Sequence, residues 1–230
     1  MGGWLTDTLG LYGRVFQRGA VLAVRNWPVG LAVIVYAALL SAAMVIAAPL
    51  GIVGGFLVYL VMVACSSSAL SLIERVVRVG RARLVDLPSG FGAYFGDLLT
   101  VGFLVFGLRL VAGIVLAPLP FLQIVFQLAV IVFLNALPEL IYLGRHEPAE
   151  LLAASYRFIG ENWIEWFPAN LVLGVAVVLA AMVPAGPLGL VGGAAMGVVL
   201  LFAMLVRGLL FLELTTSGRR AREFKRRAAG

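Results

Sequence analysis

The sequence predicts an all-α integral membrane protein in which six transmembrane helices form three hairpins with short interfacial helices and a pseudo-threefold internal repeat. Three observations predict this fold. Of the 230 residues, 63% are hydrophobic and only 12% are charged, about half the charged share of a soluble domain. Six apolar runs reach the length of a membrane span, and one hairpin sequence recurs along the chain.

The six apolar runs set the number of spans. A spanning helix needs about 20 apolar residues, and the runs cover roughly 28–48, 50–73, 98–117, 119–142, 167–184 and 187–212. They are apolar on every face, which argues against the short alternating strands of a membrane barrel. Prolines mark the three hairpin turns, at Pro49, at Pro118 with Pro120, and at Pro184 with Pro187.

Basic residues orient the spans. Fifteen of the 17 Lys and Arg residues lie in the N-terminal segment, the two segments between hairpins or the C-terminal tail, and the three turns have none. Because cytoplasmic loops of membrane proteins are enriched in Lys and Arg, we expect both termini to lie in the cytoplasm.

The repeat is clearest between the first and third hairpins. Residues 42–55 and 180–193 are identical at 11 of 14 positions at an offset of 138. At half that offset, Ala117-Pro118-Leu119 matches Ala48-Pro49-Leu50. We therefore expect one membrane domain, 1–230, with repeat units of about 1–83, 84–146 and 147–215 and a basic tail, 216–230.

A short amphipathic stretch precedes each hairpin. In the first copy Leu5, Leu9, Tyr12 and Phe16 share one helical face. The third stretch follows Pro148, and the middle one, Phe91 to Phe95, is short and rich in glycine. The three stretches end at Asn26-Trp27, Asn162-Trp163 and Asp97-Leu98. Helices of this kind rest on the membrane surface, where they either contact lipid or a partner, or only guide the chain into the bilayer.

Two of these stretches resemble a known family. FQRGAVLAVRNW (16–27) and LLAASYRFIGENWIEWF (151–167) are each an amphipathic helix with Asn-Trp just before a span. This layout resembles the YciC-like six-helix bacterial membrane proteins and the membrane domain of some glycerophosphodiester phosphodiesterases. The resemblance implies six helices and a non-catalytic role in the bacterial inner membrane, and it transfers no active site.

Arg109 is the first candidate for a functional polar residue. It follows Asp97 by twelve positions, which is ~18 Å along a helix and close to the middle of the bilayer. Ionisable residues at that depth are functional candidates. We expect Arg109 to point into the bundle and to meet Gln123 and Gln127. The cluster is then either an anion or headgroup site, or an arginine satisfied by amides and backbone carbonyls.

Other polar residues favour structural roles. Arg207, Glu74, Glu139 and Glu213 fall near the cytoplasmic ends of spans, where we expect ion pairs with arginines such as Arg75, Arg78 and Arg145. Asn135 and Pro138 predict a kink whose freed carbonyls find donors nearby, although an ion path there is the alternative. We expect Ser66, Ser67 and Ser68 to bond to carbonyls of their own helix.

Small residues at intervals of four predict close helix packing. These are Gly189, Gly193 and Gly197 in the last span, and Gly51 and Gly55 in the second. Such faces let helices approach closely, either within this bundle or between copies of the chain.

The tail is strongly basic. RRAREFKRR (219–227) has a net charge of +5, out of +6 for the chain, from Arg219, Arg220, Arg222, Lys225, Arg226 and Arg227. Near an anionic leaflet each basic residue contributes ~1 kcal/mol of attraction, so the tail is either a lipid-headgroup site or a solvated anchor. No folded basic domain accompanies it, and we do not expect nucleic-acid binding.

No catalytic motif is present. His146-Glu147 is followed by Glu150 rather than by the second histidine of a zinc protease, and the chain has neither a phosphate-binding loop nor GxSxG. We expect no enzymatic activity, metal or cofactor. The expected function is an accessory or scaffold subunit that binds lipids and a partner membrane protein or a second copy. The alternative is a transport protein, either a small channel-like bundle or a substrate-binding component.

Overall fold

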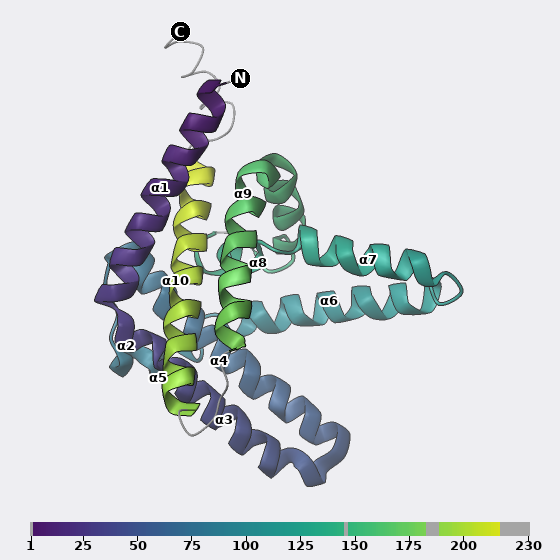
Figure 1. The fold of residues 1–230 in the computed structure, drawn as a ribbon. Coiled ribbons are helices and arrows are strands. Elements are labelled where there is room, and N and C mark those ends of the chain that lie inside the picture. The colour runs from purple at the N-terminus through teal and green to yellow at the C-terminus, as the bar shows by residue number, and fades with distance from the viewer. Residues whose placement is uncertain (1, 145–146, 183–188, 217–230) are drawn as a thin grey trace.

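Every regular element of the chain that the structure describes is a helix, which confirms the all-α prediction. The computed structural model describes residues 2–144, 147–182 and 189–216. The elements are α1 (Gly2–Arg25), α2 (Trp27–Gly30), α3 (Ala32–Ala47), the 3₁₀ turn η1 (Ala48–Leu50), α4 (Gly51–Val79), the 3₁₀ turn η2 (Leu84–Asp86), α5 (Leu87–Gly90), α6 (Phe95–Val115), α7 (Pro120–Phe133), α8 (Leu137–Tyr142), α9 (Leu151–Ala181) and α10 (Gly189–Thr216) (Figure 1).

Five helical stretches of the described chain are long and apolar enough to cross a membrane. They are Trp27–Val79, Phe95–Val115, Pro120–Tyr142, Leu151–Ala181 and Val191–Thr216. The first has 53 residues and doubles back on itself, so that α3 and α4 pack side by side (Figure 1). The chain is therefore a helical membrane protein, as its composition predicted.

Proline and glycine make the first two hairpin turns. Pro49 lies in η1, and Gly51 follows with a φ of +54°, a backbone conformation in which a Cβ is strained. In the second hairpin Pro120 is the first residue of α7, where its missing N–H costs no helical hydrogen bond. The third turn, with Pro184 and Pro187, lies outside the described residues.

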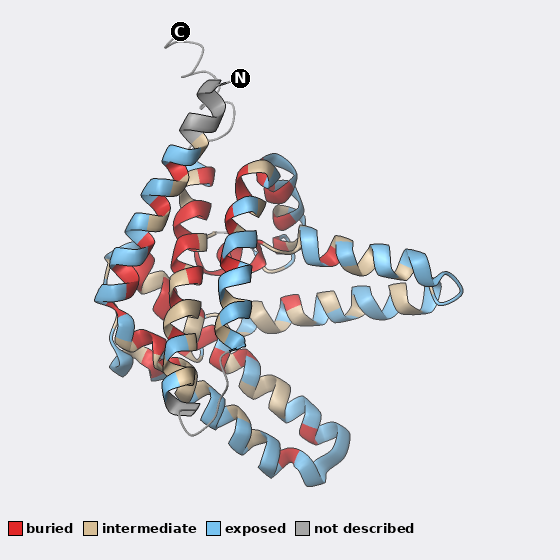
Figure 2. Ribbon diagram, in the orientation of Figure 1, coloured by how far each residue is buried: buried red, intermediate tan, exposed pale blue. Residues whose placement is uncertain are grey.

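The hairpins converge at one end of the molecule, which we call the base, and most of the core lies there. Figure 2 shows buried residues gathered at the base and exposed residues along the projecting α6–α7 hairpin and the outer part of α3–α4. In the most apolar 18-residue stretch of α6 only 6% of the residues are buried, against 50% in that of α10. The largest fully buried side chains include Trp166, Tyr142, Leu72, Leu205 and Leu210.

The amphipathic helix α1 packs along α10. Leu11, Val15 and Leu22 are buried, the ring of Phe16 meets that of Phe202, and Leu9 is exposed. The apolar face that the sequence predicted is thus shifted around the helix, and it covers protein rather than only membrane. The side chain of Leu5 lies outside the described part.

The polar junctions differ between the copies. Asn26 separates α1 from α2, because Pro28 has no N–H with which to continue the helical hydrogen bonds of α1. Asn162-Trp163 has no proline until Pro168, and α9 continues unbroken from Leu151 to Ala181. The third copy therefore has no junction between its amphipathic stretch and its span.

The middle segment departs furthest from the predicted repeat. Its amphipathic stretch is only η2 and the four-residue α5, and residues 91–94 form turns before α6 begins at Phe95. Gly90 and Gly92 explain this, because glycine is a poor helix former. The predicted interfacial helix at Phe91 to Phe95 is wrong.

Candidate functional site

The main polar cluster of the described chain is centred on Arg207, where α10 passes the break between α7 and α8. Arg207 Nε donates to Glu139 Oε1 at 2.7 Å and Nη2 donates to Glu139 Oε2 at 2.9 Å. The Glu139 side chain is fully buried, and that of Arg207 is 16% exposed. A forked arginine–carboxylate pair is among the strongest hydrogen-bonded contacts in proteins. This confirms a structural ion pair for Glu139, with Arg207 as its partner rather than an arginine named from the sequence.

The break between α7 and α8 supplies carbonyls to the cluster. α7 ends at Phe133 because Pro138 cannot donate to the preceding turn. Arg207 Nη2 donates to the Asn135 carbonyl oxygen at 2.6 Å, and Ser155 Oγ donates to that of Phe133 at 2.7 Å. The predicted kink, with its freed carbonyls satisfied nearby, is confirmed.

Helix α9 completes the surroundings of Arg207. Arg207 Nη1 donates to Asn170 Oδ1 at 2.7 Å and to Asn135 Oδ1 at 3.4 Å. Trp166 Nε1 donates to the same Asn135 oxygen at 2.9 Å, and its ring centre lies 5.3 Å from the guanidinium carbon. All five guanidinium N–H donors have acceptors. Arg207 therefore holds three helices together and has no donor left for a ligand.

A hollow of about 590 Å³ lies beside this cluster. Asn135 and Asn170, the two amides that accept from Arg207, form its polar part. Its remaining lining is aromatic and apolar: Trp163, Ile164, Phe167, Pro168 and Leu171. The site thus combines a few polar groups with apolar walls, which is the usual composition of a small-molecule pocket.

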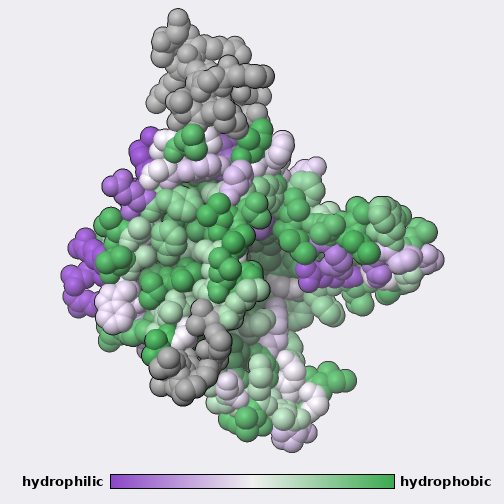
Figure 3. All heavy atoms as spheres, in the orientation of Figure 1, coloured by the Kyte–Doolittle hydropathy of each residue, from purple (hydrophilic) through white to green (hydrophobic). Residues whose placement is uncertain are grey.

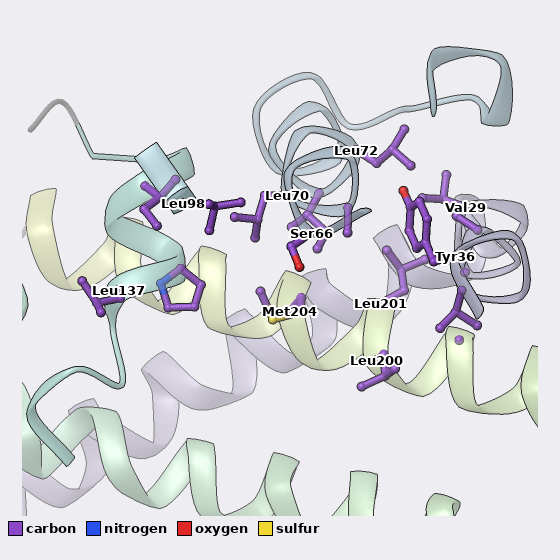
Figure 4. A pocket seen from close by; sticks show the side chains of 18 of the residues that line it. Val29, Tyr36, Ser66, Leu70, Leu72, Leu98, Leu137, Leu200, Leu201 and Met204 are labelled. Carbon is purple, nitrogen blue, oxygen red and sulfur yellow. The ribbon is translucent and has the colours of Figure 1, made fainter. Parts of the chain in front are cut away.

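A second cavity, also about 590 Å³, lies where the three hairpins converge. Figure 4 shows side chains from α2, α3, α4, α6 and α10, together with Leu137 of α8, pointing into it. Its lining is apolar except for Tyr36 and Ser66. Tyr36 is already engaged, since its hydroxyl donates to Ser68 Oγ at 2.9 Å. We call this space the axial cavity.

Two serines of α4 bond to the backbone of α5. Ser67 Oγ donates to the Gly90 carbonyl and Ser68 Oγ to the Leu87 carbonyl, both at 2.8 Å. A Cβ at Gly90 would lie 2.9 Å from Ser68 Cα, so glycine permits the close approach. The prediction that these serines bond within their own helix is wrong for Ser67 and Ser68, because α5 presents its carbonyls to them.

Hydrogen bonds also tie the loops of the base together. Asn26 Nδ2 donates to the Gly80 carbonyl at 3.2 Å, and Asn26 Oδ1 accepts from the Ala82 N–H at 3.1 Å. Tyr94 donates to Glu74, which also pairs with Arg78, as predicted. Burial and the neighbouring carboxylate raise the pKa of Tyr94. Its hydroxyl therefore keeps its proton, and the hydrogen bond to Glu74, to a higher pH than a free tyrosine would.

The structure does not bring Arg109, Gln123 and Gln127 together in a buried site. Arg109 is exposed on α6, and the two glutamines are half-buried on α7. In the part of the chain that the structure describes, none of the three has a side-chain hydrogen bond. The expectation that Arg109 points into the bundle is wrong for the single chain, because α6 and α7 project away from the other helices (Figure 1).

The predicted packing glycines do not all lie in close helix contacts. Gly197 is tightly packed: a Cβ there would overlap the carbonyl oxygen of Gly30. A Cβ at Gly193 would make an ordinary contact, and one at Gly55 would have no neighbour within 4 Å. Gly51 serves its turn, and the surroundings of Gly189 lie outside the described part. Sequence reasoning missed Gly30, because it lies in the short helix α2 and outside any ladder.

The tail with Arg219, Arg220, Arg222, Lys225, Arg226 and Arg227 lies outside the described residues, so its predicted role stays a prediction. Comparison with protein-family models, with curated proteins and with solved structures found no match.

Proposed function

We propose that the protein is a non-enzymatic subunit of the bacterial inner membrane, an accessory or scaffold that binds lipids and a partner membrane protein. The α6–α7 hairpin carries the proposal. Phe106, Leu110 and Phe121 are each more than half exposed, and apolar surface covers the projecting hairpins, with a hydrophilic patch on α6–α7 (Figure 3).

Arg109 argues for a protein on this hairpin. A lone arginine at mid-bilayer costs between ~3 and ~17 kcal/mol, and Arg109 is exposed with no partner in the described chain. Gln123 and Gln127 lie on the neighbouring helix with unused hydrogen-bonding groups. A partner that supplies acceptors to Arg109 while covering the apolar surface satisfies both needs, and a second copy of the chain is one such partner.

The alternative, a transport protein, is less well supported. A transporter needs a polar cavity near mid-membrane, whereas the axial cavity is lined almost entirely by apolar side chains. Arg109 and Gln127 do not line it, and the donors of Arg207 are all used. A cavity of this composition suits an acyl chain better than a hydrated substrate.

Photo-crosslinking tests the partner. With a benzophenone amino acid in place of Leu110 on α6, we expect irradiation of whole membranes to attach another protein. Val175 on α9 is the matched control, because its exposure of 52% nearly equals the 53% of Leu110, and we expect lipid adducts only. An adduct of twice the chain mass identifies a second copy. Lipid adducts alone at Leu110 would contradict a partner on this hairpin.

The membrane arrangement within this proposal is six spans in three hairpins, with the pseudo-threefold repeat, both termini and the base in the cytoplasm. Its support is the charge pattern along the chain: fifteen of the 17 basic residues lie in the segments outside the six predicted spans, while the three turns have none. The YciC-like resemblance agrees with this arrangement and stays a prediction.

Cysteine labelling tests the arrangement. In a Cys65→Ser background, Ile52→Cys and Leu119→Cys place thiols at exposed positions of the two described turns. We expect both to react with an impermeant thiol reagent in intact cells. Val85 lies at the base and is 77% exposed. We expect Val85→Cys to react only after the membrane is permeabilised. If only Val85→Cys is labelled in intact cells, the predicted orientation is wrong and the base lies on the outer side of the membrane.

A further inference from the structure

We propose that the hollow beside Asn135 and Asn170 binds the glycerol-ester region of a membrane phospholipid, and that neutral amide donors rather than headgroup charge recognise it. This inference rests on the lipid binding in the proposed function and assigns it a place and a chemistry.

The amide groups of the hollow have donors to spare. Asn135 Oδ1 accepts from Trp166 and Arg207, which fixes the orientation of the amide and leaves its amino group as the free end. That amino group donates to no acceptor in the part of the chain that the structure describes. Asn170 Nδ2 donates to the Trp166 carbonyl at 2.7 Å and keeps one N–H. A ligand here therefore has to bring acceptors.

The hollow offers no net positive charge. Arg207 is paired with Glu139, and its five N–H groups all have acceptors. An anionic headgroup would find no free cation there, whereas an ester carbonyl oxygen is a neutral acceptor that matches an amide donor. This distinguishes the hollow from the basic tail, for which attraction to headgroup charge was predicted.

The depth of the hollow suits an ester group. Trp163 lines the hollow and is 55% exposed, and tryptophans at the start of a span belong at headgroup level. Asn170 follows Trp163 by seven residues on the same helix, which is ~10 Å deeper. The boundary between headgroups and acyl chains, where the ester linkages lie, falls within this interval. Below it Leu171, which is 70% exposed, provides an apolar surface for the chains.

Two equally exposed tryptophans supply a matched pair of variants. Trp27 and Trp163 each follow an asparagine at the start of a span, and they are 54% and 55% exposed. Only Trp163 lines the hollow. Trp163→Ala should therefore weaken lipid binding in the hollow. Trp27→Ala removes an equally exposed interfacial tryptophan and leaves the hollow unchanged. Asn135→Asp removes both amide donors and keeps the acceptor for Trp166 and Arg207.

The experiment uses the full chain in nanodiscs that contain a phospholipid with a diazirine near the start of one acyl chain. After irradiation, adducts are mapped to peptides by mass spectrometry. We expect adducts within residues 163–171 in the wild type and in Trp27→Ala. In Trp163→Ala and Asn135→Asp we expect about fivefold lower yield, since the wall or the hydrogen bonds are lost. Equal yields in Trp163→Ala and Trp27→Ala would overturn the proposal.

Competition separates ester recognition from headgroup recognition. We expect diester phosphatidylcholine and diester phosphatidylglycerol to suppress the adducts equally, and diether phosphatidylglycerol to do so about tenfold less well, because it lacks the carbonyl acceptors. Equal competition by the diether lipid would overturn the inference. Adducts at other surfaces but none at 163–171 would also overturn it and leave the proposed lipid-binding function standing. Trp163→Ala, at an exposed position, keeps the test decisive if Asn135→Asp does not fold.

Discussion

Arg207→Leu is expected to lower the free energy of unfolding by about 3–5 kcal/mol, the cost of breaking a buried ion pair on one side. The fully buried Glu139 carboxylate would lose its only ion-pair partner among the described residues, and Asn135 and Asn170 would lose a donor. Unfolding by a strong detergent in mixed micelles, followed by tryptophan fluorescence, measures the change.

Two further variants make the result specific. Arg75→Leu breaks the ion pair of Arg75 with Asp86, whose side chains are 41% and 29% exposed. We expect the free energy of unfolding to fall by less than about 1 kcal/mol. Arg207→Leu combined with Glu139→Leu should recover part of the stability, because replacing both members of a buried pair leaves no unpaired charge. If Arg207→Leu costs no more than Arg75→Leu, the cluster does not hold the base together.

Gly197→Ala is expected to destabilise the protein by about 1–3 kcal/mol, as overpacking of a close helix contact does. The added Cβ would overlap the Gly30 carbonyl oxygen and lie 2.8 Å from Val33 Cγ1. The first overlap is with backbone, which cannot rotate away, so α2 and α10 would have to separate. The same unfolding measurement detects this.

Gly193→Ala is the control for Gly197→Ala, one turn away on the same helix. Its Cβ would lie 3.8 Å from Ile34 Cγ1, an ordinary contact. Because alanine is the better helix former by up to about 1 kcal/mol, we expect no loss or a small gain. Similar losses for both variants would contradict the view that close packing is confined to the Gly30–Gly197 crossing.

Much of the fold could be predicted from sequence because its causes are local. Apolar length fixes the candidate spans, Pro49 and Gly51 fix a turn, and Asn135 with Pro138 marks the break between α7 and α8, although Pro168 lies inside the unbroken α9. The arrangement of the hairpins could not be predicted in this way. In spans that are apolar on every face, the sequence pattern does not distinguish the face that contacts protein from the face that contacts lipid. The exposure of α6 and α7 could therefore not be predicted.

The candidate site was predicted only in part. Asn135, Glu139 and Arg207 were each identifiable as polar residues in apolar runs, and pairing was expected from the cost of leaving them alone. Their convergence with Trp166 and Asn170 depends on how α9 crosses the break between α7 and α8, which no spacing encodes. Trp166 lies near the start of a predicted span, where tryptophans usually sit at the membrane interface, and its full burial follows from that crossing.

The pairing of α1 with α10 bears on how the protein is made. Tyr12 donates to the Glu165 carbonyl of α9, 153 positions away, and α1 packs against α10, the last helix in the described chain. At roughly 5–20 residues per second of synthesis, the first helix emerges tens of seconds before its partner. During that interval its apolar face has to rest on the bilayer surface or on another protein. The base therefore closes only once α10, the last of the described helices, has been made.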